Sequence, residues 1–110
     1  MPEPTLIQVL GTGATQDATT LTIQKSALAT VGLTASANNT AESLFVALLL
    51  LAANYLNDTN QTTNVDIQVT IADSGFPQIV NRNSAQWRQI TYNVNLQTPD
   101  TGFSIDPDNY

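Results

Sequence analysis

The chain has 110 residues and a formal net charge of −6, and its only cationic side chains are Lys25, Arg82 and Arg88. Nucleic acids and anionic membranes are bound through several Lys or Arg side chains that neutralise phosphate groups, so we expect neither partner. The chain contains no Cys and no His, which excludes thiol chemistry, disulfides, the usual zinc sites and nucleophiles activated by His. We therefore expect no catalytic residues, no metal, no cofactor and no enzymatic activity.

The length fits a single domain over 1–110 that can bury a hydrophobic core. We divide it into an N-terminal arm at 1–4, a globular α+β core at 5–97 and an acidic C-terminal tail at 98–110. Charged residues make up 11% of the chain, whereas about 25% is usual. A surface so poor in charge suits a protein that stays in a large assembly, or one that is secreted. The first residues, MPEPTLIQVLG, do not form a signal peptide, because they lack a basic region and a long apolar region.

The first part of the core predicts two strands and a short helix. Thr5–Leu10 (TLIQVL) is typical of a strand, and Thr19–Gln24 (TTLTIQ) alternates apolar and polar side chains. Between them, Gly11–Ala18 predicts a hairpin loop, because its Gly-x-Gly lacks the third glycine and the Lys-Ser/Thr of phosphate-binding loops. Lys25–Val31 predicts a short helical turn, which Gly32 ends in the left-handed conformation.

The stretch Asn39–Asn57 (NTAESLFVALLLLAANYLN) predicts one long apolar helix. Asn39 is the expected N-cap, and Glu42 is placed to complete a capping box. Ten apolar residues follow without a break from Leu44 to Ala53. They are too few for a membrane span, which takes roughly 18 to 20, and they leave no polar stripe for solvent.

Most of the circumference of this helix should therefore be covered by other parts of the structure. A single sheet covers only one face of a helix. The second face requires either the loops around Phe76 and Trp87 or a second subunit.

The second part of the core predicts two further strands. Asp58–Asn64 (DTNQTTN) is expected to be a loop, whereas Asn64–Ala72 (NVDIQVTIA) and Gln86–Gln97 (QWRQITYNVNLQ) alternate as strands do. Asp73–Ala85 is expected to be the loop that joins these two strands in an antiparallel pair. The whole pattern predicts an α+β fold: a mostly antiparallel four-stranded sheet with one long apolar helix packed across it, an extended N-terminal arm and a C-terminal tail.

The tail carries three carboxylates that could form a weak calcium site, Asp100, Asp106 and Asp108. Their spacing does not match a known calcium loop, so the favoured interpretation is a solvated acidic tail. The apolar side chains within the tail are too dispersed to fold alone. Such a tail can lie on a neighbouring subunit as a clip.

Trp87, Arg88, Tyr92 and Arg82 could form an aromatic and basic patch, and Trp and Arg are favoured at the centres of interfaces. The alternative is that Trp87 covers the core while both arginines pair with local acids. The sequence leaves both interpretations open. The candidate surface for contact with an oligomer partner or another protein comprises Leu44, Leu48, Leu51, Tyr55, Phe76, Trp87, Arg88, Phe103, Ile105 and Tyr110.

The stretch Lys25–Ala53 (KSALATVGLTASANNTAESLFVALLLLAA) resembles a segment of small proteins associated with cyanobacteria and their tailed phages, and the ending Ile105–Tyr110 (IDPDNY) is similar too. Together these stretches cover about a third of the chain and include no catalytic signature. The resemblance implies a non-enzymatic virion protein that is assembled in the host cytoplasm.

Within that class, the resemblance implies most closely a capsid cement or decoration protein, which stabilises the head by binding between major capsid protein subunits. Such a protein is expected to be a small homo-oligomer, a dimer or a trimer. The alternatives are a tail, neck or baseplate subunit of a tailed phage, and a small carbohydrate- or ligand-binding module.

Overall fold

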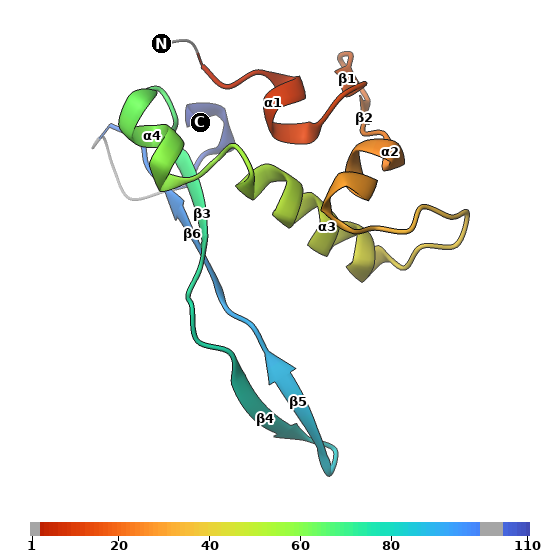
Figure 1. Cartoon of the computed structure of the whole chain (residues 1–110). Coiled ribbons are helices and arrows are strands. Elements are labelled where there is room, and N and C mark those ends of the chain that lie inside the picture. Colours follow the sequence, from red (N-terminus) through yellow and green to blue (C-terminus); the bar gives the residue numbers. More distant parts are fainter. Residues whose placement is uncertain (1–2, 100–104) are drawn as a thin grey trace.

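The structure is a computed structural model and describes residues 3–99 and 105–110. A body of short helices carries a long β-hairpin that projects away from it (Figure 1). The α+β class is confirmed. The four-stranded sheet is wrong, because the described strands form three separate two-stranded antiparallel sheets.

Helix α1 (Leu6–Leu10) stands where a first strand was expected. Thr5 Oγ1 accepts a hydrogen bond from the backbone N–H of Gln8 at 3.1 Å, and Gln8 Oε1 accepts one from the N–H of Thr5 at 2.9 Å. This reciprocal pair is a capping box, and it starts a helix in a segment whose side chains also suit a strand. The helix ends at Gly11, whose φ of 92° and ψ of 167° form a backbone conformation that is open mainly to glycine.

A small hairpin and a second helix follow α1. Strand β1 (Thr15–Gln16) pairs with β2 (Leu21–Thr22), so the expected strand at Thr19–Gln24 is present but short. Helix α2 (Lys25–Leu28) continues into the 3₁₀ turn η1 (Ala29–Val31). Gly32 ends this turn at φ 106° and ψ 2°, which confirms the expected left-handed cap.

Helix α3 (Ala41–Ala53) is the longest element, and its N-cap is Thr40 and not Asn39. The Thr40 hydroxyl accepts a hydrogen bond from the N–H of Ser43 at 3.1 Å. Asn39 instead holds the preceding loop, because its side chain accepts from the N–H of Ser36 and donates to the carbonyl of Thr34. Both residues can cap a helix, and only the backbone of Thr40 lies at the helix start.

The chain bends at 54–57 and continues as α4 (Asp58–Thr63), where a loop was expected. The helical region from 41 to 63 is therefore a bent helix of 23 residues, and it is not apolar as a whole, because α4 contains only polar side chains. The expectation of one long apolar helix over Asn39–Asn57 is wrong in this respect. Capping by Asn57 explains α4 better than propensity does, since its Oδ1 accepts from the N–H of Asn60 at 2.8 Å.

The hydrophobic core lies mainly between α3 and α2, and not between a helix and a wide sheet. Ala27, Leu28, Ala47 and Leu51 form its buried centre. Gly11 packs against this centre so closely that a Cβ there would lie 2.5 Å from the Cβ of Ala27. In the described part of the chain, the buried hydrophobic side chains are few, and apart from two Leu and two Ile they are alanines, so the core is thin for a chain of this length.

Strand β3 (Val69–Asp73) pairs with β6 (Tyr92–Leu96) in antiparallel register, with Ile71 opposite Val94. This confirms the expected antiparallel pairing of the third and fourth predicted strands. Ile71 is buried, and its N–H donates to the carbonyl of Leu56 at 2.9 Å. The base of the long hairpin is thereby fixed to the end of the helical region.

Strands β4 (Gln78–Arg82) and β5 (Ala85–Gln89) extend the same hairpin, although Asp73–Ala85 was expected to be a loop. Between the two ladders, four residues on one side (74–77) face two on the other (90–91). The tip is a two-residue turn in which Asn83 and Ser84 both have positive φ, 50° and 63°. Such a turn matches the twist of the strands that it joins. We call residues 74–91 the hairpin arm.

The last residues fold back onto their own chain. The 3₁₀ turn η2 (Pro107–Asn109) is capped by Asp106, whose side chain accepts from the N–H of Asp108 at 3.0 Å. The carbonyl of Asn109 accepts from Gln68 Nε2 at 3.1 Å. In the protomer, residues 105–110 therefore contact their own chain, and their role as a clip on a neighbouring subunit stays a prediction. Asp100, one of the three carboxylates weighed as a weak calcium site, lies outside the described residues.

None of the helices in the described part of the chain has the length and apolar character needed to cross a membrane.

Asn57 joins the two halves of the bent helix. In addition to capping α4, its Nδ2 donates to the carbonyls of Ala53 at 3.1 Å and Asn54 at 3.2 Å. We expect Asn57→Ala to lower the free energy of unfolding by about 1–2 kcal/mol. Asn54→Ala, at an exposed neighbouring position, should lower it by less than about 0.5 kcal/mol. Urea denaturation of both variants tests this, and equal losses would contradict it.

The turn of the β1–β2 hairpin is held by Asp17. Its Oδ1 accepts from the backbone N–H groups of Thr19 and Thr20, each at 2.8 Å, and its carboxylate also accepts from both hydroxyls. These hydrogen bonds, with that of the Thr19 N–H foremost, lower the pKa of Asp17 to about 2. The charged form is therefore favoured in the folded state.

The folded-state pKa of Asp17 lies below the unfolded value, which is about 3.9. Its contribution to stability should be complete above that unfolded value and should be lost as pH falls toward 2. We expect a carboxyl titration by NMR to give a pKa near 2. Asp17→Asn should flatten the loss of stability over this acid range. An unshifted carboxyl titration would contradict the assigned hydrogen bonds.

Candidate interaction surface

Helix α3 is apolar on two faces, and the core covers only one of them. Leu44, Ala47, Leu48 and Leu51 form the face that packs against α2 and its neighbours. A second apolar row consists of Val46, Leu49 and Leu50, at the three- and four-residue spacing of one helix face. We call this row the outer face of α3.

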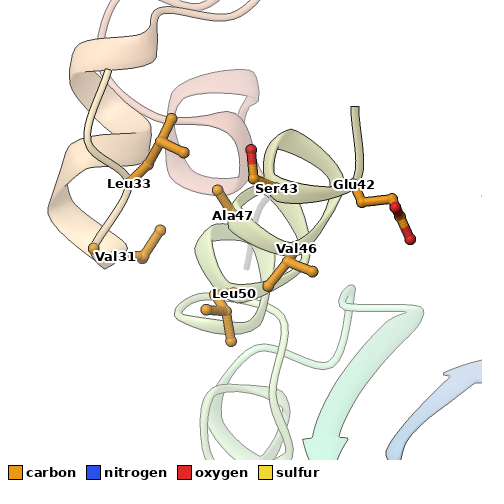
Figure 2. A pocket seen from close by; sticks show the side chains of 8 residues that line it. Val31, Leu33, Glu42, Ser43, Val46, Ala47 and Leu50 are labelled. Carbon is orange, nitrogen blue, oxygen red and sulfur yellow. The ribbon is translucent and has the colours of Figure 1, made fainter. Parts of the chain in front are cut away.

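A hollow of about 360 Å³ opens between α3 and the end of the α2–η1 segment. Figure 2 shows Val31 and Leu33 on one side of it and Val46 and Leu50 on the other. Glu42 lies at its edge, with the carboxylate directed away from the aliphatic side chains. We call this space the α3 hollow. Its lining consists mostly of aliphatic side chains with one acid at the rim.

A second hollow, of about 430 Å³, separates α3 from the base of the hairpin. Val46, Leu49 and Leu50 line it on the helix side. Arg88, Ile90 and Tyr92 line it on the hairpin side. Because Val46 and Leu50 line both hollows, the outer face of α3 is a ridge with open space on either side of it.

The loops expected to cover the second face of α3 do not do so. Phe76 is 80% exposed at the break between the two ladders, and Trp87 is 48% exposed on β5. Both side chains belong to the projecting hairpin arm (Figure 1). The other cover expected for this face of α3, a second subunit, stays a prediction.

The hairpin arm has two different faces. Trp87 lies opposite Val80, and Arg82, two pairs along the ladder, lies on the same face. Arg88 lies opposite Ile79 on the other face. The Arg82 guanidinium carbon lies 4.3 Å from the centre of the Trp87 ring, a cation–π contact. We call the face with Val80, Arg82 and Trp87 the Trp87 face.

The expected aromatic and basic patch is thereby split. Arg82 and Trp87 share one face of the arm, whereas Arg88 and Tyr92 point toward the hollow beside α3. Within residues 3–99 and 105–110, no carboxylate forms an ion pair with either arginine. The alternative in which both arginines pair with local acids is therefore wrong for the described residues.

The structure distributes the remaining candidate residues over several places. Leu44, Leu48 and Leu51 belong to the core side of α3. Tyr55 is half-buried, with its Oη 3.5 Å from Asn64 Nδ2. Two positions of the tail differ, since Ile105 is 71% exposed and Tyr110 is half-buried. Phe103 lies outside the described residues.

The outer-face residues Val46, Leu49 and Leu50, and Ile79 on the arm, were not among the residues expected from the sequence to form a contact surface. A helical projection does not separate the outer face of α3 from the core face, because the ten residues from Leu44 to Ala53 are all apolar. The arm residues could have been found from Asn83-Ser84, a pair of turn residues flanked by two segments of strand-forming composition.

The protomer is larger and more open than its mass requires. Its accessible surface is 8135 Å², whereas a folded monomer of 11.8 kDa exposes about 5,900 Å². Its radius of gyration is 16.2 Å, against about 13 Å for a compact domain of this length. The excess surface, about 2,200 Å², is within the range that one subunit buries in an obligate oligomer.

Among the described residues, no group of three or more acidic side chains is placed to hold a metal ion. No family model matches the chain, and no significant match was found among curated proteins or solved structures. The assignment of a role therefore rests on the surface of the protein and on its sequence.

Buried and exposed apolar positions of α3 should respond differently to truncation. Leu51 is 8% exposed and Phe45, on the same helix, is 67% exposed. We expect Leu51→Ala to lower the free energy of unfolding by about 2–5 kcal/mol. Phe45→Ala removes more atoms but should lower it by less than about 1 kcal/mol. Urea denaturation of dilute protein tests this, and similar losses would mean that Phe45 is covered within the protomer.

Proposed function

We propose that this protein is a non-enzymatic structural subunit of a tailed-phage virion. In this proposal it is a capsid cement or decoration protein that works as a small homo-oligomer, a dimer or trimer, and stabilises the head by binding between major capsid protein subunits. The observation that carries the assembly role is the partly open outer face of α3, where Val46 is exposed and Leu49 and Leu50 are half-buried. The resemblance of Lys25–Ala53 and Ile105–Tyr110 supports the virion.

An uncovered apolar ridge favours assembly over a solitary role. Large apolar patches on a soluble protein mark interaction sites, and Val46 on the ridge is 51% exposed. The hairpin arm adds further exposed apolar side chains, Ile79 at 65% and Ile90 at 54%. The excess of accessible surface over that of a compact monomer supports burial of these groups in an oligomer.

A cement protein stabilises a shell by mass action, because it binds the assembled shell and not the separated subunits. The exposed features of this chain suit such binding, since the hairpin arm projects away from the body (Figure 1) and offers its side chains for contact with a neighbouring subunit. The net charge of −6 and the scarcity of cations support protein partners over nucleic acid or membrane. The lack of Cys and His supports a role without catalysis.

The hairpin arm also supports the second candidate, a tail, neck or baseplate subunit. Projecting strands with free edges can join subunits around a ring by pairing with a neighbour. A carbohydrate-binding module has less support. A small-ligand site needs polar groups that converge on the ligand, whereas both hollows beside α3 are lined mainly by aliphatic side chains.

The oligomer is tested first, by light scattering during gel filtration. We expect a mass of two or three times 11.8 kDa, independent of loading at micromolar concentrations, because the outer face of α3 needs cover. A strict monomer over this range would overturn the oligomer proposal.

The cement role is tested on particles prepared with and without the protein. We expect particles that carry it to survive heating or low salt longer, because its binding energy is added to the intact shell. Immunogold labelling locates the protein on the same particles. Equal survival would exclude the cement role, and labelling at the tail would favour the second candidate.

A further inference from the structure

The hairpin arm is not stabilised by its own protomer. Every residue from 81 to 91 is exposed, and a two-stranded hairpin alone is marginally stable in water. Its side chains nevertheless include a preformed contact, because Trp87 Nε1 donates to the carbonyl of Arg82 at 3.3 Å and the guanidinium stacks on the ring. An ordered aromatic and cationic pair on an exposed arm is typical of a binding anchor.

Charge is strongly segregated between the hairpin arm and the rest of the chain. The arm contains Arg82, Arg88 and no acid, a formal charge of +2. All other residues together contain one Lys and nine acids, a formal charge of −8. The arm of one copy is therefore attracted to the body of another copy, which is electrostatic complementarity within a single sequence.

The α3 hollow has the matching chemistry on the body. It offers aliphatic walls from Val31, Leu33, Val46 and Leu50 for a large apolar side chain, and it has Glu42 at its rim (Figure 2). The Trp87 face offers the complement of an indole beside a guanidinium. The Trp87 face also points away from its own α3, because Arg88 on the opposite face lines the hollow at the hairpin base.

We propose that, in the homo-oligomer, the hairpin arm of one copy lies across α3 of a second copy, with Trp87 in the α3 hollow and Arg82 beside Glu42. This inference rests on the oligomer of the proposed function and specifies its interface. Each copy donates one arm and receives one. The exchange is reciprocal in a dimer and passes around the ring in a trimer.

The area available agrees with this arrangement. The excess accessible surface of the protomer, about 2,200 Å², compares with about 1,000–2,500 Å² per subunit in obligate interfaces. Exchange of the arm would cover the outer ridge of α3 and the Trp87 face together. It would thus remove from solvent the two apolar surfaces that the protomer leaves open.

The test compares charge reversals on the two faces of one arm. Arg82→Glu and Arg88→Glu change the net charge equally, and both positions are exposed. We expect Arg82→Glu to weaken self-association at least about 30-fold, as loss of an interface hot spot does. Arg88→Glu should weaken it far less, because Arg88 faces its own α3. Masses over a dilution series give the dissociation constants.

The receiving site is tested by exchanging the charges. Glu42→Arg alone should weaken association as Arg82→Glu does, and the double variant Arg82→Glu/Glu42→Arg should regain most of the lost affinity. Far-UV circular dichroism and thermal unfolding check that each variant keeps its fold. No recovery in a folded double variant would overturn the pairing of Arg82 with Glu42.

Trp87 supplies an independent signal because it is the only tryptophan in the chain. Its fluorescence in the wild type should shift to the red on dilution, in step with the fall in mass, as the indole leaves the α3 hollow. Trp87→Ala should lower the mass toward 11.8 kDa. A monomer at all concentrations would overturn the oligomer and the arm exchange together. A stable oligomer with unchanged mass in both Arg82→Glu and Trp87→Ala would overturn the arm exchange alone.

Discussion

The structure depends on a mismatch between an apolar helix and the material available to cover it. Helix α3 presents aliphatic side chains on two faces, and the core of Ala27, Leu28, Ala47 and Leu51 uses only one. A compact chain of this length could bury the second face under a wide sheet. Here the strands that could form such a sheet extend away from the body as a hairpin (Figure 1), so the protomer leaves the second face only partly covered.

The direction of the hairpin is fixed at its base by buried contacts and amide hydrogen bonds. Ile67 and Ile71 are buried beside the helical region. Gln61 Nε2 donates to the carbonyl of Ile67 at 2.8 Å and to Gln97 Oε1 at 2.8 Å. This network ties α4 to the ends of β3 and β6, which is why a polar six-residue helix persists here. The hairpin therefore leaves the body as a supported ladder, and its support ends at the break near Phe76.

The sequence predicted the features that depend on local chemistry and failed where distant contacts decided the outcome. The cap at Gly32 could be predicted because glycine favours the left-handed conformation. The antiparallel pairing of β3 with β6 could be predicted because apolar and polar side chains alternate strictly in both segments. The prediction of a strand at Thr5–Leu10 was wrong. A short apolar run is compatible with a helix or a strand, and the Thr5–Gln8 capping box stabilises the helix. The prediction of a loop at Asp73–Ala85 was wrong because its Gly and Pro mark only the break between the two ladders, after which β4 pairs with β5. The sequence could predict that α3 is apolar on a second face. Which residues form that face depended on the position of α2.

The segregation of charge gives the open surfaces a preference for one another. The cationic arm and the acidic body of one chain would attract each other within the protomer if the hairpin could fold back so that its Trp87 face met the body. The β3–β6 ladder directs the arm, and Arg88 and Tyr92 are the side chains that it turns toward its own α3. The Trp87 face is thereby directed away from its own α3. In the proposed arm exchange, the acidic, apolar surface that it meets is that of another copy. Like-charged bodies repel at random encounter, so the attraction of the arm would also select the orientation in which two copies meet.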